Sequence, residues 1–359
     1  MSKYLWYSGA TDITGIALAE ALHIESGKVK PRGKDIIIGW GTKMLDRERD
    51  ENVDLGNAKV INHPNAICKN RNKLNALEML KADRHTANNI AAFYTPNNVI
   101  RGIDRGDISF PLIARKKRHQ GGKGLLVCLV KSHVVKAIEY GADYFQAYID
   151  IKTEYRLHVF DGKIIYAVEK VENPTESGWI NQRKEKVLEH ANKNEVNLDN
   201  ATVDYVLGQL VKEAVLPDQI VRSNKRGWKF SGINTNTIPD SLKNAAIKAV
   251  EIMGLDFGAV DCALDMSDHP FIIEINSGPG LQRTSLEKYI AAFTKKFAEI
   301  ERPAERLAPR ARRVAAAAVG RVEEQENQGI DDVALVHMMN AVQSPAEARR
   351  LLDLAMRRR

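Results

Sequence analysis

Short runs of apolar residues, many alternating with polar ones, recur along the chain and predict a fold rich in strands. The expected strands cover 4–7, 35–41, 59–62, 111–115, 125–130, 144–149, 153–160, 163–171, 257–264 and 270–276. Apolar residues at helical spacing predict helices over 14–22, 69–82, 131–140, 201–214 and 239–253. Strands and helices that follow one another in this way predict an α/β (α+β) fold.

Three pairs of neighbouring strands are expected to form hairpins. Asp161-Gly162 separates one pair, the turn at 267–269 separates another, and the glycine-rich loop 119–124 separates the third. An Asp-Gly pair between two alternating runs is a strong hairpin signal. The sequence therefore predicts antiparallel pairing after an N-terminal α/β unit.

The composition changes from about Ala298 onward, where Ala, Arg and Glu dominate. This segment predicts one or two exposed helices with little core. The formal net charge of the chain is +7, and arginines such as Arg312 and Arg313 gather here. We favour a solvated helical tail over a nucleic-acid-binding one, because charge runs are weak motifs, and we leave a role in homo-oligomer assembly open.

The chain shows no sign of export or membrane insertion. No apolar stretch approaches the roughly 20 residues needed to span a bilayer, and the N-terminus lacks the long apolar core of a signal peptide. The cysteines, Cys68, Cys128 and Cys262, are far apart and odd in number. They favour buried thiols in a reducing cytoplasm over disulfides or a zinc site.

Three oxygen-bearing residues lie on the last two predicted strands. Alternation puts Glu274 and Asn276 on one face of their strand, and Asp261 lies on the strand before it. If the strands pair, two carboxylates and an amide converge, which are the ligands that Mg²⁺ prefers, with Mn²⁺ as an alternative. Strand-end polar groups with local hydrogen bonds are the less favoured interpretation, because burying unpaired carboxylates is costly.

The segment from Leu255 to Gly280 resembles the metal-binding end of the ATP-grasp superfamily. It is most similar to the ribosomal-protein glutamate ligase type and to phage-encoded members, and the similarity spans about 62–289. The resemblance implies that Asp261, Glu274 and Asn276 hold one or two Mg²⁺ ions that bridge the phosphates of ATP. For a phage-encoded protein the compartment would be the host cytoplasm.

The resemblance also implies a domain organisation. It predicts an α/β pre-ATP-grasp domain, an ATP-grasp N-terminal lobe with a glycine-rich flap, an ATP-grasp C-terminal lobe with the metal site, and a basic helical tail. Their expected bounds are 1–85, 86–142, 143–297 and 298–359.

Basic and glycine-rich segments match the phosphate-binding parts of that family. Arg115, beside Lys116 and Lys117, stands where the family has a lysine, and Lys73 at a predicted helix start resembles the other phosphate lysine. A solvent-facing basic edge is the alternative for Arg115. The expected flap over the triphosphate consists of Gly121, Gly122, Lys123 and Gly124.

The adenosine half of the nucleotide is assigned from the family pattern. Gln146, Ala147, Tyr148 and Ile149 resemble the hinge between the lobes, whose backbone contacts adenine. Glu154 falls where the family keeps an acid for the ribose hydroxyls, and the nearby Asp150 competes for that role.

The remaining candidates concern catalysis. Arg156 resembles a family arginine that faces the phosphate and acyl-phosphate region, with a cross-strand ion pair as the alternative. Lys170 and Asn181 resemble positions near the γ-phosphate and the substrate carboxylate, and the basic, aromatic segment 224–228 predicts a further turn.

The resemblance implies an ADP-forming carboxylate–amine ligase that works through an acyl-phosphate. Its acid and amine substrates are small molecules or peptides. A phosphotransferase is an alternative, because the same fold hosts kinases. A nucleic-acid- or virion-associated ATP-binding protein that uses the Arg-rich tail is a third.

Overall fold

The computed structural model describes residues 1–8, 12–42, 55–117, 125–172 and 228–302. Contacts within the chain divide it into Met1–Lys296 and Phe297–Arg359. The expected flap, the expected helix at 201–214 and nearly all of the expected tail lie outside the described residues, and the domain bounds stay predictions. None of the described helices is long and apolar enough to cross a membrane.

The first sheet is parallel and has the order β2-β1-β3-β4. Its strands are β1 (Lys3–Tyr7), β2 (Glu25–Gly27), β3 (Ile36–Trp40) and β4 (Lys59–Ile61). Helix α1 (Asp12–Ala21) connects β1 to β2. Every residue of β3 is buried, which is typical of a parallel strand covered on both faces. The predicted N-terminal α/β unit is confirmed.

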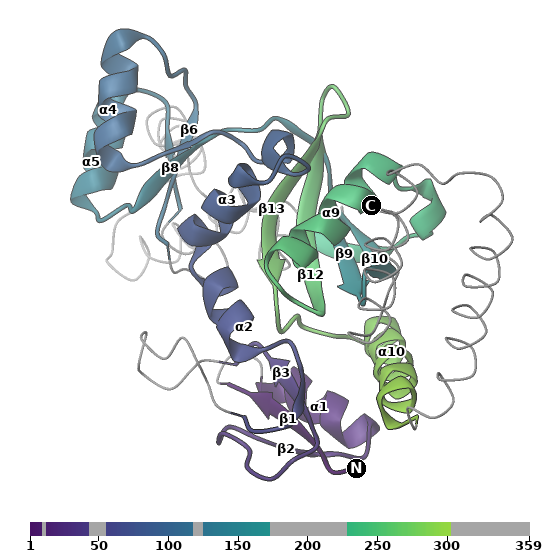
Figure 1. The fold of residues 1–359 in the computed structure, drawn as a ribbon. Coiled ribbons are helices and arrows are strands. Elements are labelled where there is room, and N and C mark those ends of the chain that lie inside the picture. Colours follow the sequence, from purple (N-terminus) through teal and green to yellow (C-terminus); the bar gives the residue numbers. More distant parts are fainter. Residues whose placement is uncertain (9–11, 43–54, 118–124, 173–227, 303–359) are drawn as a thin grey trace, which may run out of the picture. The chain divides into compact units, whose positions relative to one another are not determined.

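The second sheet is antiparallel and has the order β5-β8-β6-β7. Its strands are β5 (Phe93–Tyr94), β6 (Leu112–Arg115), β7 (Leu126–Cys128) and β8 (Tyr144–Ala147). Helices α4 (Pro96–Arg105) and α5 (Lys131–Glu139) pack side by side on it around Val99, Val134 and Phe145 (Figure 1). Helix α4 was not predicted from the sequence; Thr95 caps its start, and Gly106 ends it in a left-handed conformation.

The third sheet is antiparallel and has the order β11-β10-β9-β12-β13. Its strands are β9 (Ile151–Phe160), β10 (Lys163–Glu172), β11 (Trp228–Gly232), β12 (Phe257–Asp265) and β13 (Pro270–Asn276). Two predicted hairpins, β9–β10 and β12–β13, are confirmed. The expected turn at 224–228 is wrong at its last residue, because Trp228 begins β11.

The two faces of this sheet differ in character. Helix α9 (Asp240–Ile252) covers one face, where Leu157, Val159 and Val260 join its apolar core (Figure 1). Because side chains alternate along a strand, Glu154 and Arg156 of β9 point to the opposite face. One strand thus supplies both a core and a polar surface.

A β-bulge interrupts this alternation in β13. Asp261 of β12 lies opposite Glu274, whereas the next residue, Cys262, lies opposite Ile272, so that Ile273 is the extra residue. The insertion lets both Ile272 and Ile275 reach the core under α9 while Glu274 stays on the polar face.

The helix expected over 69–82 is wrong as a single element. The chain forms α2 (Pro64–Arg71) and α3 (Lys73–Ala82), separated by Asn72 in an extended conformation. The Asn72 side chain accepts a hydrogen bond from the N–H of Asn75 and so caps a new helix. Lys73 is the first residue of α3, as its predicted place at a helix start requires.

The remaining elements of the described chain are two short 3₁₀ helices and one long helix. They are η2 (Ala87–Asn89), η4 (Thr235–Thr237) and α10 (Thr284–Glu301). All three cysteines are free, and Cys128 and Cys262 are buried as predicted, whereas Cys68 is only partly buried. Burial raises the pKa of the Cys128 thiol to about 11.

Asn62 joins the N-terminal sheet to the third sheet. Its amide nitrogen donates to the carbonyl of Phe257 at 2.9 Å, and its Oδ1 accepts from the N–H groups of Asp256 and Phe257 at 2.7 and 3.0 Å. Asn62 is fully buried and has a φ of 60°, a left-handed conformation that Asn tolerates better than most residues. It therefore fixes the start of β12.

Stacked aromatic rings reinforce this junction. Trp40 of β3 stacks on Phe257 of β12 with ring centroids 5.2 Å apart. Tyr289 of α10 meets the edge of both rings, at 5.5 Å from Trp40 and 5.9 Å from Phe257. Aromatic pairs in this geometry add to the stabilisation that burial gives.

We expect Asn62→Ala to lower the free energy of unfolding by about 2–3 kcal/mol, since it leaves buried backbone groups unpaired. Asn62→Gly loses the same hydrogen bonds but accepts the positive φ, so it should be less destabilised than Asn62→Ala by about 1 kcal/mol. Urea unfolding of the three proteins measures both differences. A wild-type midpoint in Asn62→Ala would contradict the assigned role.

Candidate functional site

Strand register brings the predicted site residues together in two adjacent rows on the polar face of the third sheet. In one row, Glu274, Asp261 and Arg156 lie side by side on β13, β12 and β9. In the next row, Glu154 of β9 lies beside Lys170 of β10. The cluster therefore draws on four neighbouring strands of one rigid sheet.

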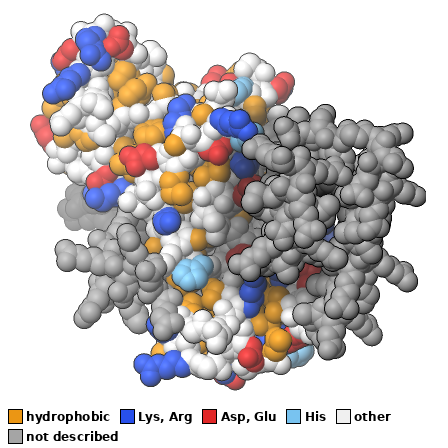
Figure 2. Space-filling view, viewed as in Figure 1, with side chains coloured by type: hydrophobic (Ala, Val, Ile, Leu, Met, Phe, Trp, Pro, Cys, Tyr) orange, Lys and Arg blue, Asp and Glu red, His pale blue; other side chains and the backbone are white. Residues whose placement is uncertain are grey.

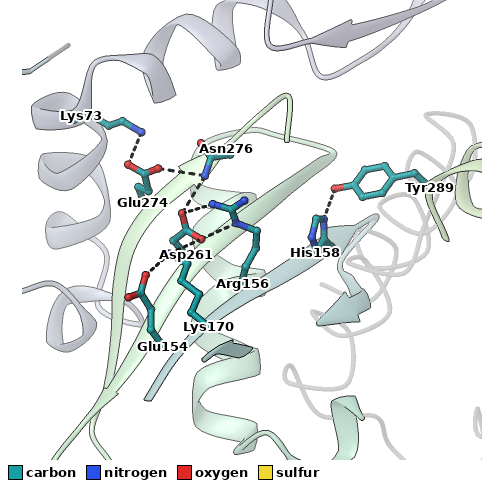
Figure 3. A network of polar contacts seen from close by, with 9 residues as sticks. All are labelled: Lys73, Glu154, Arg156, His158, Lys170, Asp261, Glu274, Asn276 and Tyr289. Atoms are coloured by element: carbon teal, nitrogen blue, oxygen red, sulfur yellow. Dashed lines mark hydrogen bonds and ion pairs between the residues drawn. The ribbon is translucent and has the colours of Figure 1, made fainter. Parts of the chain in front are cut away.

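Arg156 and Asp261 form a bidentate ion pair at the centre of the cluster (Figure 3). The Nε and Nη2 atoms of Arg156 donate to the two carboxylate oxygens of Asp261 at 2.8 and 2.9 Å. The side chain of Asp261 is 5% exposed, and burial alone would raise its pKa. The cations of Arg156 and Lys170 outweigh burial and hold the pKa of Asp261 below its usual range, so the carboxylate stays charged.

Lys170 connects the two rows. Its Nζ donates to Glu154 and lies 3.6 Å from Asp261. Burial opposes the charge on Lys170, but the carboxylates of Asp261 and Glu154 raise its pKa above the usual value. The ammonium group is therefore kept cationic in a place with little water.

Glu274 and Asn276 extend the cluster toward helix α3. Lys73 approaches Glu274 at 3.2 Å, and the amide nitrogen of Asn276 lies 3.3 Å from an oxygen of both Asp261 and Glu274 (Figure 3). Burial raises the pKa of Glu274, yet the nearby Lys73 brings it below the usual value. The three predicted metal ligands thus occupy one spot.

The donor set suits a hard divalent cation. Asp261 and Glu274 offer carboxylate oxygens. Asn276 can offer its carbonyl oxygen if its side-chain amide flips, because which amide atom points at the site is set by the hydrogen-bond partners present. No group of three His, Cys, Asp or Glu side chains suited to a metal occurs in the described part of the chain. Two carboxylates with an amide oxygen resemble a Mg²⁺ site more than a zinc site.

Lys73 and Arg115, the two predicted phosphate cations, lie near each other. Both line a small cavity of about 20 Å³ with Glu274 and Tyr144. The N–H of Lys73 donates to the carbonyl of Lys117, which ties the start of α3 to the chain after β6. The buried Nε of Arg115 has no hydrogen-bond partner among the described residues.

The predicted hinge consists of the last two residues of β8 and the two residues after it, and it borders a hollow of about 370 Å³. The N–H groups of Ala147 and Tyr148 already donate to the carbonyls of Ala92 and Pro111. Adenine could use either donor only if these hydrogen bonds opened. The hollow is lined by residues 91–92, 147–150, 265–267 and Phe271, and Gln146 is buried beside it in β8.

The two candidates for the ribose differ in their surroundings. Asp150 lines the hollow, whereas Glu154 is buried and bound to Lys170. Both assignments stay predictions. The flap residues Gly121, Gly122, Lys123 and Gly124 and the candidate Asn181 lie outside the described residues.

Some residues beside the site escaped the sequence analysis. Phe230 of β11 stands over Arg156, and the buried His158 lies 3.4 Å from the hydroxyl of Tyr289. Burial and the cation of Arg156 lower the pKa of His158 to about 3, so its ring is neutral at physiological pH. The alternation in 228–232 is a signal that could have predicted β11.

Charges of both signs are interspersed over the surface. Figure 2 shows basic side chains beside acidic ones, with apolar side chains between them, on the coloured part of this face. This face of the described residues therefore gives no support to a broad nucleic-acid-binding surface.

We expect Arg156→Met to lower the free energy of unfolding by about 3 kcal/mol at pH 7, because it leaves a buried carboxylate with only part of its compensation. The double variant Arg156→Met/Asp261→Asn should recover much of this loss. Urea unfolding measures both. Equal stability of the single and double variants would contradict the assigned pairing.

The same variant should change how stability depends on pH. In the wild type, Asp261 has a lowered pKa, so its contribution is present above the unfolded value of 3.8 and is lost as pH falls through the folded value. Without Arg156 that shift shrinks or reverses. The stability difference between the two proteins should therefore narrow as the pH is lowered from 7 toward 3, in unfolding curves recorded across that range.

Comparisons with known proteins bear on the family and the fold of the chain. A family model described as the RimK-like ATP-grasp domain matches residues 215–300. No curated protein sequence matches the chain.

Solved structures share its fold at low sequence identity. ATP-grasp ligase PsnB, complexed with a minimal precursor, is 11% identical over 83% of this chain and 99% of its own, with a TM-score of 0.51. The D-alanine–D-alanine ligase from Bacillus anthracis is 12% identical over 82% and 91%, with a TM-score of 0.51. A RiPP-associated ATP-grasp ligase from Chryseobacterium gregarium is 15% identical over 82% and 96%, with a TM-score of 0.50. The chain therefore has the ATP-grasp fold and resembles the RimK-like branch of that superfamily over residues 215–300.

Proposed function

We propose that this protein is an ATP- and Mg²⁺-dependent ligase that joins a carboxylate to an amine, with release of ADP and phosphate. The observation that carries the proposal is that Asp261, Glu274 and Asn276 lie together on one sheet face, beside the cations Arg156 and Lys170 of that face and Lys73 of α3. Paired opposite charges in one place are what a metal-bound triphosphate requires: oxygen ligands for the metal and cations for the phosphates.

The metal would be held by Asp261, Glu274 and Asn276. When bound, it would neutralise phosphate charge and orient the triphosphate for transfer. Lys73 reaches Glu274 from α3 and shares a cavity wall with Arg115 from β6, so these two cations stand on the side toward the second sheet. We assign them to the ATP phosphates.

Arg156 and Lys170 stand on the other side of Asp261. In the proposed reaction a carboxylate oxygen of the acid attacks the γ-phosphorus, the bond to the β-phosphate oxygen breaks, and ADP leaves. The amine then attacks the acyl carbon, phosphate leaves with the bonding electrons, and the amine loses a proton. Arg156 and Lys170 would stabilise the negative charge that builds up on the acyl-phosphate and on the carbonyl oxygen.

The chemistry requires little covalent participation by the protein. Positioning and electrostatic stabilisation suffice for phosphoryl transfer. His158 is neutral, buried and held by Tyr289, and Cys262 faces the apolar core under α9 with a strongly raised pKa. Neither residue is suited to act as a nucleophile in this cluster.

The substrates are proposed as a class. Structures that share the fold include a D-alanine–D-alanine ligase and a ligase in complex with ADP and a leader and core peptide. We infer that the acid of this protein is an amino acid or a peptide side chain. The amine is a second amino acid, a polyamine or a peptide.

An ADP-release screen tests the proposal. Purified protein with Mg²⁺ and ATP is supplied with amino acids, polyamines and peptides, singly and in pairs, and ADP and phosphate are measured. We expect release that depends on both an acid and an amine, together with a product whose mass equals their sum minus water. A stable phosphorylated product would instead identify a phosphotransferase.

Glu274→Gln should reduce that release by about 100-fold or more, because it removes a charged metal ligand and the partner of Lys73. Glu251→Gln is the matched control, since Glu251 is exposed on α9 and paired only with Lys248 among the described ion pairs. In calorimetry, Glu274→Gln should bind Mg²⁺ and AMPPNP more weakly than the wild type, whereas Glu251→Gln should bind them as the wild type does. Equal binding by the two variants would contradict the assigned metal site.

A further inference from the structure

Phe230 is a large apolar residue in an unusual position for its type. It lies on β11 and is 36% exposed, whereas the other aromatic side chains of the third sheet are buried or partly buried. It is directly opposite Lys170 in the β10–β11 register, and residues directly opposite share a face of the sheet. Phe230 is therefore on the face that carries the charged cluster.

The ring of Phe230 lies against the guanidinium of Arg156. The distance from the Cζ atom of Arg156 to the ring centroid is 4.8 Å, within the range of a cation–π contact. Lys170 is the second cation near the ring, with its Nζ 5.7 Å from the centroid. One ring thus contacts both cations that flank Asp261.

Arg156 consequently has two different supports. Asp261 binds the Nε and Nη2 atoms through hydrogen bonds at 2.8 and 2.9 Å, and Phe230 contacts the guanidinium through its ring. The first support is one that a bound metal would compete for, since Asp261 is a proposed metal ligand. The second support is independent of the metal.

We propose that Phe230 is a positioning residue that holds Arg156 over the site, and that its ring shields the two cations from water. The purpose of this role rests on the proposed function. In that function Asp261 would bind a metal, and Arg156 would then need another residue to hold it in place. The ring supplies that restraint without adding a negative charge that would repel phosphate. Exclusion of water strengthens the attraction between the cations and a bound anion.

The side-chain Nε–H signal of Arg156 in ¹H–¹⁵N spectra reports this contact directly, and Arg156→Lys assigns it. A group stacked on a ring face is shifted upfield by the ring current. In Phe230→Leu we expect this upfield shift to vanish, because the cation–π contact is lost, while the hydrogen bond from Nε–H to Asp261 stays in place. Phe230→Tyr and Phe230→Trp should keep the upfield shift.

Trp228→Leu is the control, since it changes an aromatic residue on the same strand two positions earlier. It should leave the Arg156 signal unchanged. If the Phe230→Leu protein keeps the upfield shift, the proposal is overturned. It is also overturned if Trp228→Leu and Phe230→Leu both lose the shift.

The spectra are repeated with Mg²⁺ and AMPPNP, with binding followed by calorimetry in the same samples. We expect the wild-type shift to persist in the bound protein, and its loss on binding would overturn the proposal. If the wild type fails to bind Mg²⁺ and AMPPNP at all, the proposed function fails. The nucleotide-free spectra then still decide whether Phe230 positions Arg156.

Discussion

The buried carboxylate of Asp261 sets the strongest constraint on this structure. A charged group with 5% of its side chain exposed must be compensated, because moving an isolated charge out of water is costly. Compensation comes from Arg156 on the neighbouring strand and Lys170 one strand further, while Asn276 donates from the other side. Opposite charges therefore meet across neighbouring strands: Arg156 of β9 lies beside Asp261 of β12, and Glu154 of β9 lies beside Lys170 of β10.

Other features of the fold keep this arrangement in place. The bulge at Ile273 lets β13 present Glu274 to the site while its isoleucines stay in the core. The break at Asn72 starts a new helix at Lys73, and this places Lys73, the third cation of the cluster, beside Glu274. On the far side, Gly278 lies so close to Gly41 that a Cβ atom would come within 2.7 Å of the Gly41 nitrogen. A side chain there would push the N-terminal sheet away from the end of β13.

The ion pairs of the cluster would also affect ligand binding in the proposed reaction. A fully paired cluster is stable as it stands, so a metal and a phosphate group must replace contacts that the protein already makes. Mg²⁺ would take the carboxylates, and the phosphates would take the cations, so that the two ligands bind more favourably together than alone. The groups that stabilise the fold would then also be the groups that bind and stabilise the reacting atoms.

Much of this could be predicted from the sequence, because strand alternation and turn residues act over a few positions. The strands that carry Asp261, Glu274 and Asn276, the hairpins and the place of Lys73 at a helix start all follow from such local signals. The partners of the charges do not. Arg156 and Asp261 are 105 residues apart, and only the pairing of β9 with β12 makes them neighbours. The contact of Phe230 with Arg156 likewise depends on the pairing of β11 with β10 at the sheet edge, between strands that are far apart in the sequence. The sequence by itself thus determined which chemical groups this protein has and which face of each strand bears them. Only the tertiary structure decided which opposite charges meet, since that choice depends on burial and on contacts between distant segments.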